Sequence, residues 1–152
     1  LLTLFPQLTI ILKRELLWIP IYGWGLAATG PIAINRGSGR ASLKQINTQG
    51  KTRLEAGQSI LCFPEGTRMM PGSKPDYKPG GAMLAATTGY PVVPVALNSG
   101  ECWQKKTFLK KPGTITVSIG PAIETKGKKA SKILKESQDW IEAKMQEINF
   151  TA

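Results

Sequence analysis

The stretch Ser59-Ile60-Leu61-Cys62-Phe63-Pro64-Glu65-Gly66-Thr67-Arg68 decides the fold, because a short apolar run gives way at once to a polar loop. The pattern predicts a buried strand over 59–63 that delivers the loop to the edge of a sheet, where open α/β folds bind their ligands. Pro64 has no N–H to donate to a strand ladder, and Gly66 permits backbone angles closed to other residues. The final threonine and arginine supply a hydroxyl and a five-donor fork, which suit a phosphate group.

The tetrapeptide Glu-Gly-Thr-Arg alone does not distinguish a phosphate site from an ordinary solvated loop, so the interpretation depends on the flanking segments. Upstream, Ile32 to Asn35 is a second predicted strand that leaves Arg36 at its carboxyl end. Because the carboxyl ends of parallel strands meet at one edge of a sheet, we expect Arg36 and Arg68 to converge. Two separate, solvated arginines are the alternative.

The rest of the chain alternates between predicted strands and predicted helices. The further strands are expected at 9–13, 91–97 and 114–119, and the helices at 20–28, 42–56, 82–88 and 131–148. Ser42 is the expected cap of its helix, and Pro94 argues for an edge or a bulge in its strand. The alternation predicts an α/β layered fold, with a mainly parallel central sheet flanked by helices, in a single domain over 1–152.

The segment Met69 to Gly81 contains three prolines and three glycines, which predicts an irregular loop over the site. Lys78 lies in this loop, just before Gly80 and Gly81 open a short helix. A lysine beside a helix N-terminus forms a natural anion site, although an exposed loop lysine is the plainer interpretation.

The net charge limits the classes of partner. Twenty Lys and Arg against ten Asp and Glu give the 152 residues a formal charge of +10, which favours nucleic acid, an acidic lipid surface or phosphorylated small molecules. We find no nucleic-acid reader motif, so no nucleic-acid partner is expected. Histidine is absent and Cys62 and Cys102 are distant in sequence, which argues against a zinc centre or a thiol–imidazole pair.

Residues 16–34 form a run of 19 residues without a formal charge, long enough in principle to span a bilayer. Prolines and glycines cut the run into pieces, so we interpret it as a short helix and a strand instead. Its aromatic residues Trp18, Tyr22 and Trp24 are compatible with core packing and equally with a membrane-facing patch.

Several blocks, taken in order, resemble those of the glycerophospholipid acyltransferases, most closely the bacterial branch that acylates 1-acyl-sn-glycerol-3-phosphate. The blocks are Lys13-Arg14-Glu15-Leu16, Pro20, Gly23, 30–36, 63–68 and 92–97. That family's first block, a His and an Asp separated by four residues, is not in this sequence. Because the chain starts with Leu, we expect a truncated enzyme with the block upstream; a relative that has lost the base is the alternative.

The resemblance implies transfer of a fatty acyl group from acyl-CoA or acyl carrier protein to the sn-2 hydroxyl of lysophosphatidate, giving phosphatidate. It implies no cofactor, no metal and no covalent enzyme intermediate, with the upstream His as general base. It also implies an anionic membrane surface as partner, at the cytoplasmic face of the bacterial inner membrane. A non-catalytic lipid-phosphate binding relative is one alternative, and an enzyme for another lysophospholipid or for glycerol-3-phosphate is the other.

By similarity, the residues present bind the substrate and none of them is catalytic. The substrate-binding residues are Lys13, Arg36, Glu65, Gly66, Thr67, Arg68 and Lys78. Asn35 departs from the Asp often found before that arginine, which affects how Arg36 is oriented but leaves the cation. Glu65 is expected to orient a cation or the polyol instead of acting as a base, because a carboxylate beside Arg68 should have a lowered pKa.

Overall fold

The computed structural model describes residues 5, 7–70, 72–73, 75–104 and 107–149 of the chain. The chain divides into two compact units, Leu1–Phe63 and Pro64–Ala152, and each unit is described by itself. The assignment of the chain to a single domain stays a prediction.

Unit 1 is built on a three-stranded parallel sheet with the order β2-β1-β3. The strands are β1 (Leu8–Lys13), β2 (Ile32–Ile34) and β3 (Ser59–Leu61). The two outer strands pair with different halves of the central strand β1. Strand β3 pairs with its first half and β2 with its second half. The predicted mixed α/β fold with a parallel sheet is confirmed, although β3 ends two residues earlier than expected.

Short helices and one long helix complete unit 1. They are the 3-10 helices η1 (Arg14–Trp18) and η2 (Arg36–Ser38), and the α-helices α1 (Tyr22–Ala28) and α2 (Arg40–Glu55). Helix α2 packs against β2 and β3, and its side chains also bind the strand connections. Gln45 Nε2 donates to the Ala33 carbonyl at 2.8 Å, and Arg53 Nη2 donates to the Gly30 carbonyl at 3.1 Å.

The expected cap of α2 is wrong. The helix begins at Arg40 after Gly39, which has a φ of +44°, and Ser42 lies inside its first turn. The Ser42 hydroxyl is buried and donates to the Asn35 carbonyl instead of accepting from the helix backbone. The Ser42 hydroxyl therefore does not cap the helix. Its hydrogen bond to Asn35 ties α2 to the residue that follows β2.

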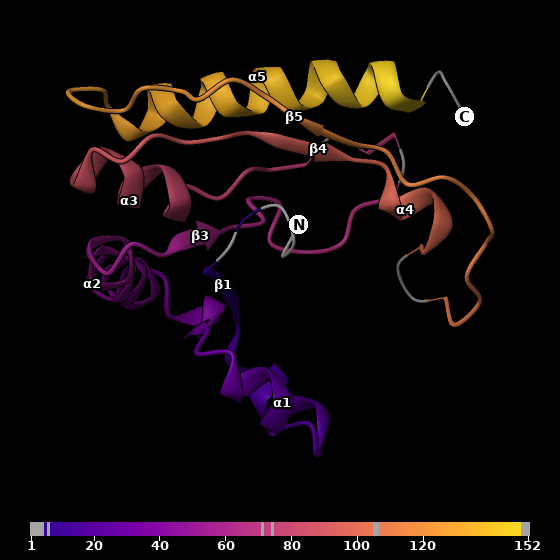
Figure 1. The fold of residues 1–152 in the computed structure, drawn as a ribbon, viewed down its shortest axis with the longest axis horizontal. Helices are drawn as coiled ribbons and strands as arrows, with labels where there is room; N and C mark the ends of the chain where they lie inside the picture. Colours follow the sequence, from indigo (N-terminus) through magenta and orange to yellow (C-terminus); the bar gives the residue numbers. More distant parts are fainter. Residues whose placement is uncertain (1–4, 6, 71, 74, 105–106, 150–152) are drawn as a thin grey trace. The chain divides into compact units, whose positions relative to one another are not determined.

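Unit 2 combines a two-stranded antiparallel sheet with helices. Its elements are α3 (Gly80–Thr88), β4 (Val95–Leu97), α4 (Ser99–Cys102), β5 (Val117–Ile119) and α5 (Ala130–Asn149). Figure 1 shows the yellow helix α5 running beside β4 and α3, against both of which it packs. Its apolar face is buried as the sequence predicts, with Ile133, Ile141 and Ile148 in the core.

The predicted buried strand over 91–97 is only partly correct. Regular pairing covers Val95–Leu97, and before it Val92 makes one isolated antiparallel bridge with Ile123. Between them Pro94 lacks an N–H, but its carbonyl accepts from Gly120 at 2.9 Å. Val93 is 40 % exposed, so the run is not buried on both faces. The ladder is interrupted beside the proline, as expected for an edge or a bulge.

Candidate functional site

The polar loop that follows β3 is ordered by the segment before α3. Residues 62–70 form no helix or strand, and the Pro64 carbonyl accepts a hydrogen bond of 2.8 Å from the Lys78 backbone N–H. This bond places the loop next to the start of α3. Gly66 has a φ of +67°, in the left-handed region that side chains disfavour, so glycine is required for this turn.

Glu65 does not have the environment that the sequence suggests. Burial raises the pKa of its carboxyl above 4.5, and the nearby Glu142 carboxylate raises it further, against a backbone hydrogen bond that lowers it. The expectation of a pKa lowered by Arg68 is therefore wrong. Desolvation and the second carboxylate outweigh the backbone hydrogen bond, and the Arg68 guanidinium lies over the Trp103 ring instead of pairing with Glu65.

Tyr77 anchors this acidic corner of unit 2. Its ring is 6 % exposed, and its hydroxyl donates to Glu142 Oε1 at 3.0 Å. Burial, first, and then the hydrogen bond to Glu142 raise the pKa of Tyr77 far above its ordinary value. Tyr77 thus stays a neutral donor, and it fixes the helix α5 carboxylate beside the loop of Glu65.

Arg68 is exposed and is held by an aromatic face. Its guanidinium carbon lies 4.8 Å from the centre of the Trp103 ring. The Lys110 ammonium nitrogen lies at the same distance, 4.8 Å, from that ring. Two cations therefore share one indole, and Arg68 keeps its N–H donors accessible to an anion.

In unit 1, Lys13 and Arg36 gather around one carboxylate. Lys13 Nζ lies 3.2 Å from Glu15 Oε1. A backbone hydrogen bond at Glu15 chiefly lowers the pKa of this half-buried carboxyl, followed by Lys13, with a smaller electrostatic contribution from Arg36. Asn35 Oδ1 accepts from Gly37 N at 3.1 Å and shapes the turn that carries Arg36. The carboxyl ends of β1 and β2 therefore present both predicted cations at one edge.

The predicted site residues fall into two groups. Lys13 and Arg36 belong to unit 1, whereas Glu65, Gly66, Thr67, Arg68 and Lys78 belong to unit 2. Lys78 is exposed and pairs with Asp76, and Thr67 is exposed. The convergence of Arg36 with Arg68 stays a prediction.

Three residues of the unit 2 site were missed in the sequence. Tyr77 and Glu142 lie far apart in the chain, and no local pattern joins them. Trp103 stands in a basic segment that also contains four lysines, at 105, 106, 110 and 111. An aromatic residue close to several lysines is the signal that would have identified it.

The aromatic residues near the start of the chain are exposed. Trp18 is 71 % exposed, Tyr22 58 % and Trp24 70 %, so core packing is wrong for these three side chains. They belong to η1 and α1, which contact each other. Among the described residues, no helix combines the length and the apolar character needed to cross a bilayer.

Comparisons with known proteins agree on one family. The family model described as Acyltransferase matches residues 2–98. A 1-acyl-sn-glycerol-3-phosphate acyltransferase from Pseudomonas aeruginosa is 41 % identical over 148 residues, which are 95 % of this chain and 58 % of the relative. A protein of the same name from Limnanthes douglasii is 32 % identical over 76 % of this chain and 41 % of its own length. The chain thus spans about half the length of the curated relatives it matches.

A solved structure shares the fold. The crystal structure of the 1-acyl-sn-glycerophosphate (LPA) acyltransferase PlsC from Thermotoga maritima matches with a TM-score of 0.72 and 25 % identity. The match covers 93 % of this chain and 56 % of that one. It therefore includes residues of both units.

Proposed function

Because this chain belongs to the acyltransferase family, we propose that the protein transfers a fatty acyl group to the sn-2 hydroxyl of 1-acyl-sn-glycerol-3-phosphate, giving phosphatidate. The observation that carries the proposal is the 41 % identity, over 95 % of the chain, to a relative named for this reaction. The exposed Arg68, stacked on Trp103 at the end of a glycine turn, supports it with a cation suited to a phosphate.

The chemistry requires a base for the acceptor hydroxyl, since an alcohol is a weak nucleophile at neutral pH. We propose that a His with an Asp five positions after it, upstream of this sequence, removes the proton. The oxygen attacks the thioester carbonyl, the C–S bond breaks, and the thiol leaves with a proton as the new ester forms. Acyl-CoA or acyl carrier protein is the acyl donor, and no cofactor takes part.

The residues of this chain hold the substrate. Arg68 binds phosphate oxygens as a planar fork, and Gly66 allows the backbone to approach them closely. Arg36 is the second phosphate cation, with Lys13 and Lys78 as further contributors. Thr67 supplies a hydroxyl donor.

Glu65 has a different role in this proposal. Because burial raises its pKa and it lies beside Glu142, we expect Glu65 to orient the polyol and not to pair with Arg68. Of the two roles that the sequence suggested, orienting a cation or the polyol, the proposal keeps the second.

We also propose that the protein works on an anionic membrane surface, at the cytoplasmic face of a bacterial inner membrane. The formal charge of +10 favours attraction to acidic lipid. The exposed aromatic rings of Trp18, Tyr22 and Trp24 suit the headgroup level of a bilayer, where amphipathic rings concentrate.

The test is an assay of the full-length protein with lysophosphatidate and acyl-CoA or acyl carrier protein. We expect the upstream coding sequence to contain His-x4-Asp, and thiol release to depend on lysophosphatidate. Without that block the family's mechanism is excluded. Binding of lysophosphatidate without thiol release would favour a non-catalytic relative. Faster transfer to glycerol-3-phosphate or to another lysophospholipid would reassign the acceptor.

A further inference from the structure

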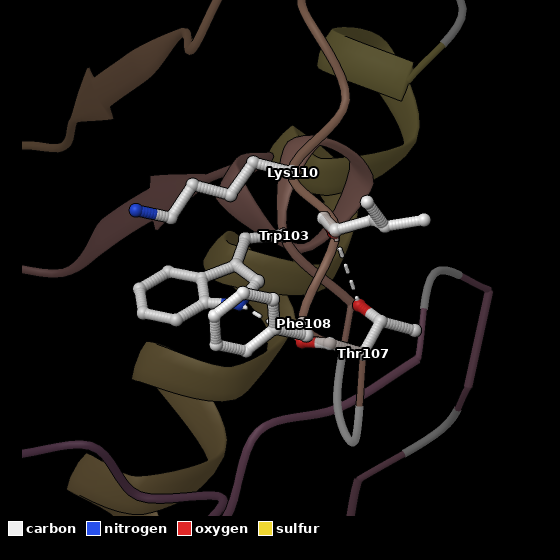
Figure 2. Close-up of a pocket in the computed structure, with 5 residues that line it drawn as sticks. Trp103, Thr107, Phe108 and Lys110 are labelled. Atoms are coloured by element: carbon white, nitrogen blue, oxygen red, sulfur yellow. Dashed lines mark hydrogen bonds between the residues drawn. The ribbon is translucent and has the colours of Figure 1, made fainter.

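The connection between α4 and β5 carries an exposed apolar tip. Phe108 is fully exposed, Leu109 is 82 % exposed and Trp103 is 46 % exposed. These side chains, with Thr107 and Lys110, line a hollow of about 400 Å³, and Figure 2 draws them as sticks. Adjacent large apolar side chains so fully in water are uncommon on a soluble surface and indicate an interaction site.

The loop is built to present this tip. Its ends are joined by a backbone hydrogen bond of 2.8 Å from Lys111 N to the Cys102 carbonyl. Within it, Trp103 Nε1 donates to the Thr107 carbonyl at 3.3 Å, and the Thr107 hydroxyl donates to the Gln104 carbonyl at 3.0 Å. The bond from Trp103 to Thr107, which Figure 2 draws, holds the Trp103 ring against the loop next to Phe108.

Positive charge surrounds the tip. Lys110 and Lys111 follow it directly, and both are exposed. Arg68 and Lys110 stack on Trp103, and residues 102–113 include no Asp or Glu. Apolar side chains beside lysines match the two layers of an anionic membrane interface, since acyl chains accept the first and lipid phosphates attract the second.

We propose that residues Trp103, Thr107, Phe108, Leu109, Lys110 and Lys111, termed the membrane loop, insert into the surface of an anionic lipid bilayer. The inference rests on the proposed function, because it places a contact with the membrane that would hold the lipid substrate. Trp103 then lies at the headgroup level, and Arg68 on its face lies where a lysophosphatidate phosphate is presented. The loop therefore joins membrane contact to phosphate binding.

An acidic carrier protein is the other partner with suitable charge. A carrier protein would need a concave or flat complementary surface, whereas Phe108 and Leu109 project into solvent. A fluid bilayer accommodates projecting side chains without a matching pocket. The observations therefore favour lipid.

The experiment is sedimentation of full-length protein with vesicles of phosphatidylcholine, alone or mixed with phosphatidylglycerol. We expect Phe108→Ser combined with Leu109→Ser to lower partitioning onto the mixed vesicles at least about tenfold, because each apolar side chain contributes substantially when buried. Ile115→Ser is the matched control, since Ile115 is 53 % exposed and lies outside the membrane loop. Equal partitioning of the loop variant and the wild type would overturn the inference.

A second pair of variants tests whether binding depends on attraction between the lysines of the membrane loop and anionic lipid. Lys111→Glu should weaken binding to the mixed vesicles several-fold more than Lys132→Glu, another exposed lysine of unit 2. Equal effects of the two reversals, or equal binding of the wild type to neutral and mixed vesicles, would overturn the anionic part of the inference.

Acyl-transfer assays distinguish a failure of this inference from a failure of the proposed function. The double loop variant should keep the wild-type rate on detergent-dispersed lysophosphatidate and lose rate on vesicles. If the wild type transfers no acyl group in detergent, the proposed function fails whatever the vesicles show. If the variant loses transfer from acyl carrier protein in detergent yet binds vesicles normally, the loop contacts the carrier and the lipid inference is overturned.

Discussion

The guanidinium carbon of Arg68 and the ring centre of Trp103 are 4.8 Å apart. An aromatic face attracts the cation without consuming its N–H donors, unlike a carboxylate, which would occupy them. Lys110 lies at the same distance from the ring, so the cluster also carries excess positive charge. Such an arrangement keeps an arginine oriented and available for an anionic ligand.

Replacing Trp103 should therefore affect substrate binding more than turnover. We expect Trp103→Ala to raise the KM for lysophosphatidate about two- to fivefold with little change in kcat, because an exposed cation–π contact is worth about 0.5–1 kcal/mol. Trp103→Phe should restore most of the affinity, since a ring is retained. Tyr90→Ala, at an aromatic residue 41 % exposed, is the control. An unchanged KM in the alanine variant would contradict the positioning role.

Arg68 and Lys110 share the ring but are not equivalent. We expect Arg68→Ala to lower kcat/KM about ten- to a hundredfold, because a charge-assisted hydrogen bond is worth about 1.5–3 kcal/mol. Lys110→Ala should cost less than about threefold on detergent-dispersed substrate, as expected for an exposed charge. Steady-state kinetics of the full-length protein measure both, and equal losses would count against the assigned phosphate site.

Glu65 should make stability depend on pH. Burial raises the pKa of this carboxyl above 4.5, so the folded protein holds the proton more tightly than the unfolded chain. The stability that Glu65 contributes is complete below pH 4.5 and is lost as the pH rises through the folded-state pKa.

Glu65→Gln should therefore become more stable relative to the wild type as the pH rises through that range. Denaturant unfolding at a series of pH values gives the difference in free energy of unfolding. Glu124→Gln, at an exposed site, is the control. A difference that shrinks with rising pH would contradict a raised pKa at Glu65.

The two glycines of α1 should respond oppositely to alanine. A Cβ at Gly23 would lie 2.3 Å from the Leu17 carbonyl oxygen, whereas one at Gly25 would meet nothing within 4 Å. We expect Gly23→Ala to cost about 1–3 kcal/mol through overpacking against η1. Gly25→Ala should gain up to about 1 kcal/mol, because alanine favours a helix over glycine. Denaturant unfolding measures both, and a neutral Gly23→Ala would mean that α1 and η1 separate easily.

Much of the fold was predictable because its signals are local. Strand β1, helix α1 and helix α5 follow from apolar spacing and from turn residues, and they lie close to the expected positions. The Ser42 cap was wrong because the Ser42 hydroxyl donates to the Asn35 carbonyl. The strand over 91–97 was partly correct, because the ladder between the Val92 bridge and β4 is interrupted beside Pro94, which lacks an N–H.

The sequence by itself determined the family blocks, the glycine turn at Gly66 and the placement of cations at strand ends, because residue type and spacing are properties of the chain alone. Only the tertiary structure decided that Trp103 holds Arg68, that Glu142 and burial raise the pKa of Glu65, and that Phe108 projects into water. Contacts, desolvation and exposure depend on which distant segments pack together, and no local pattern encodes them.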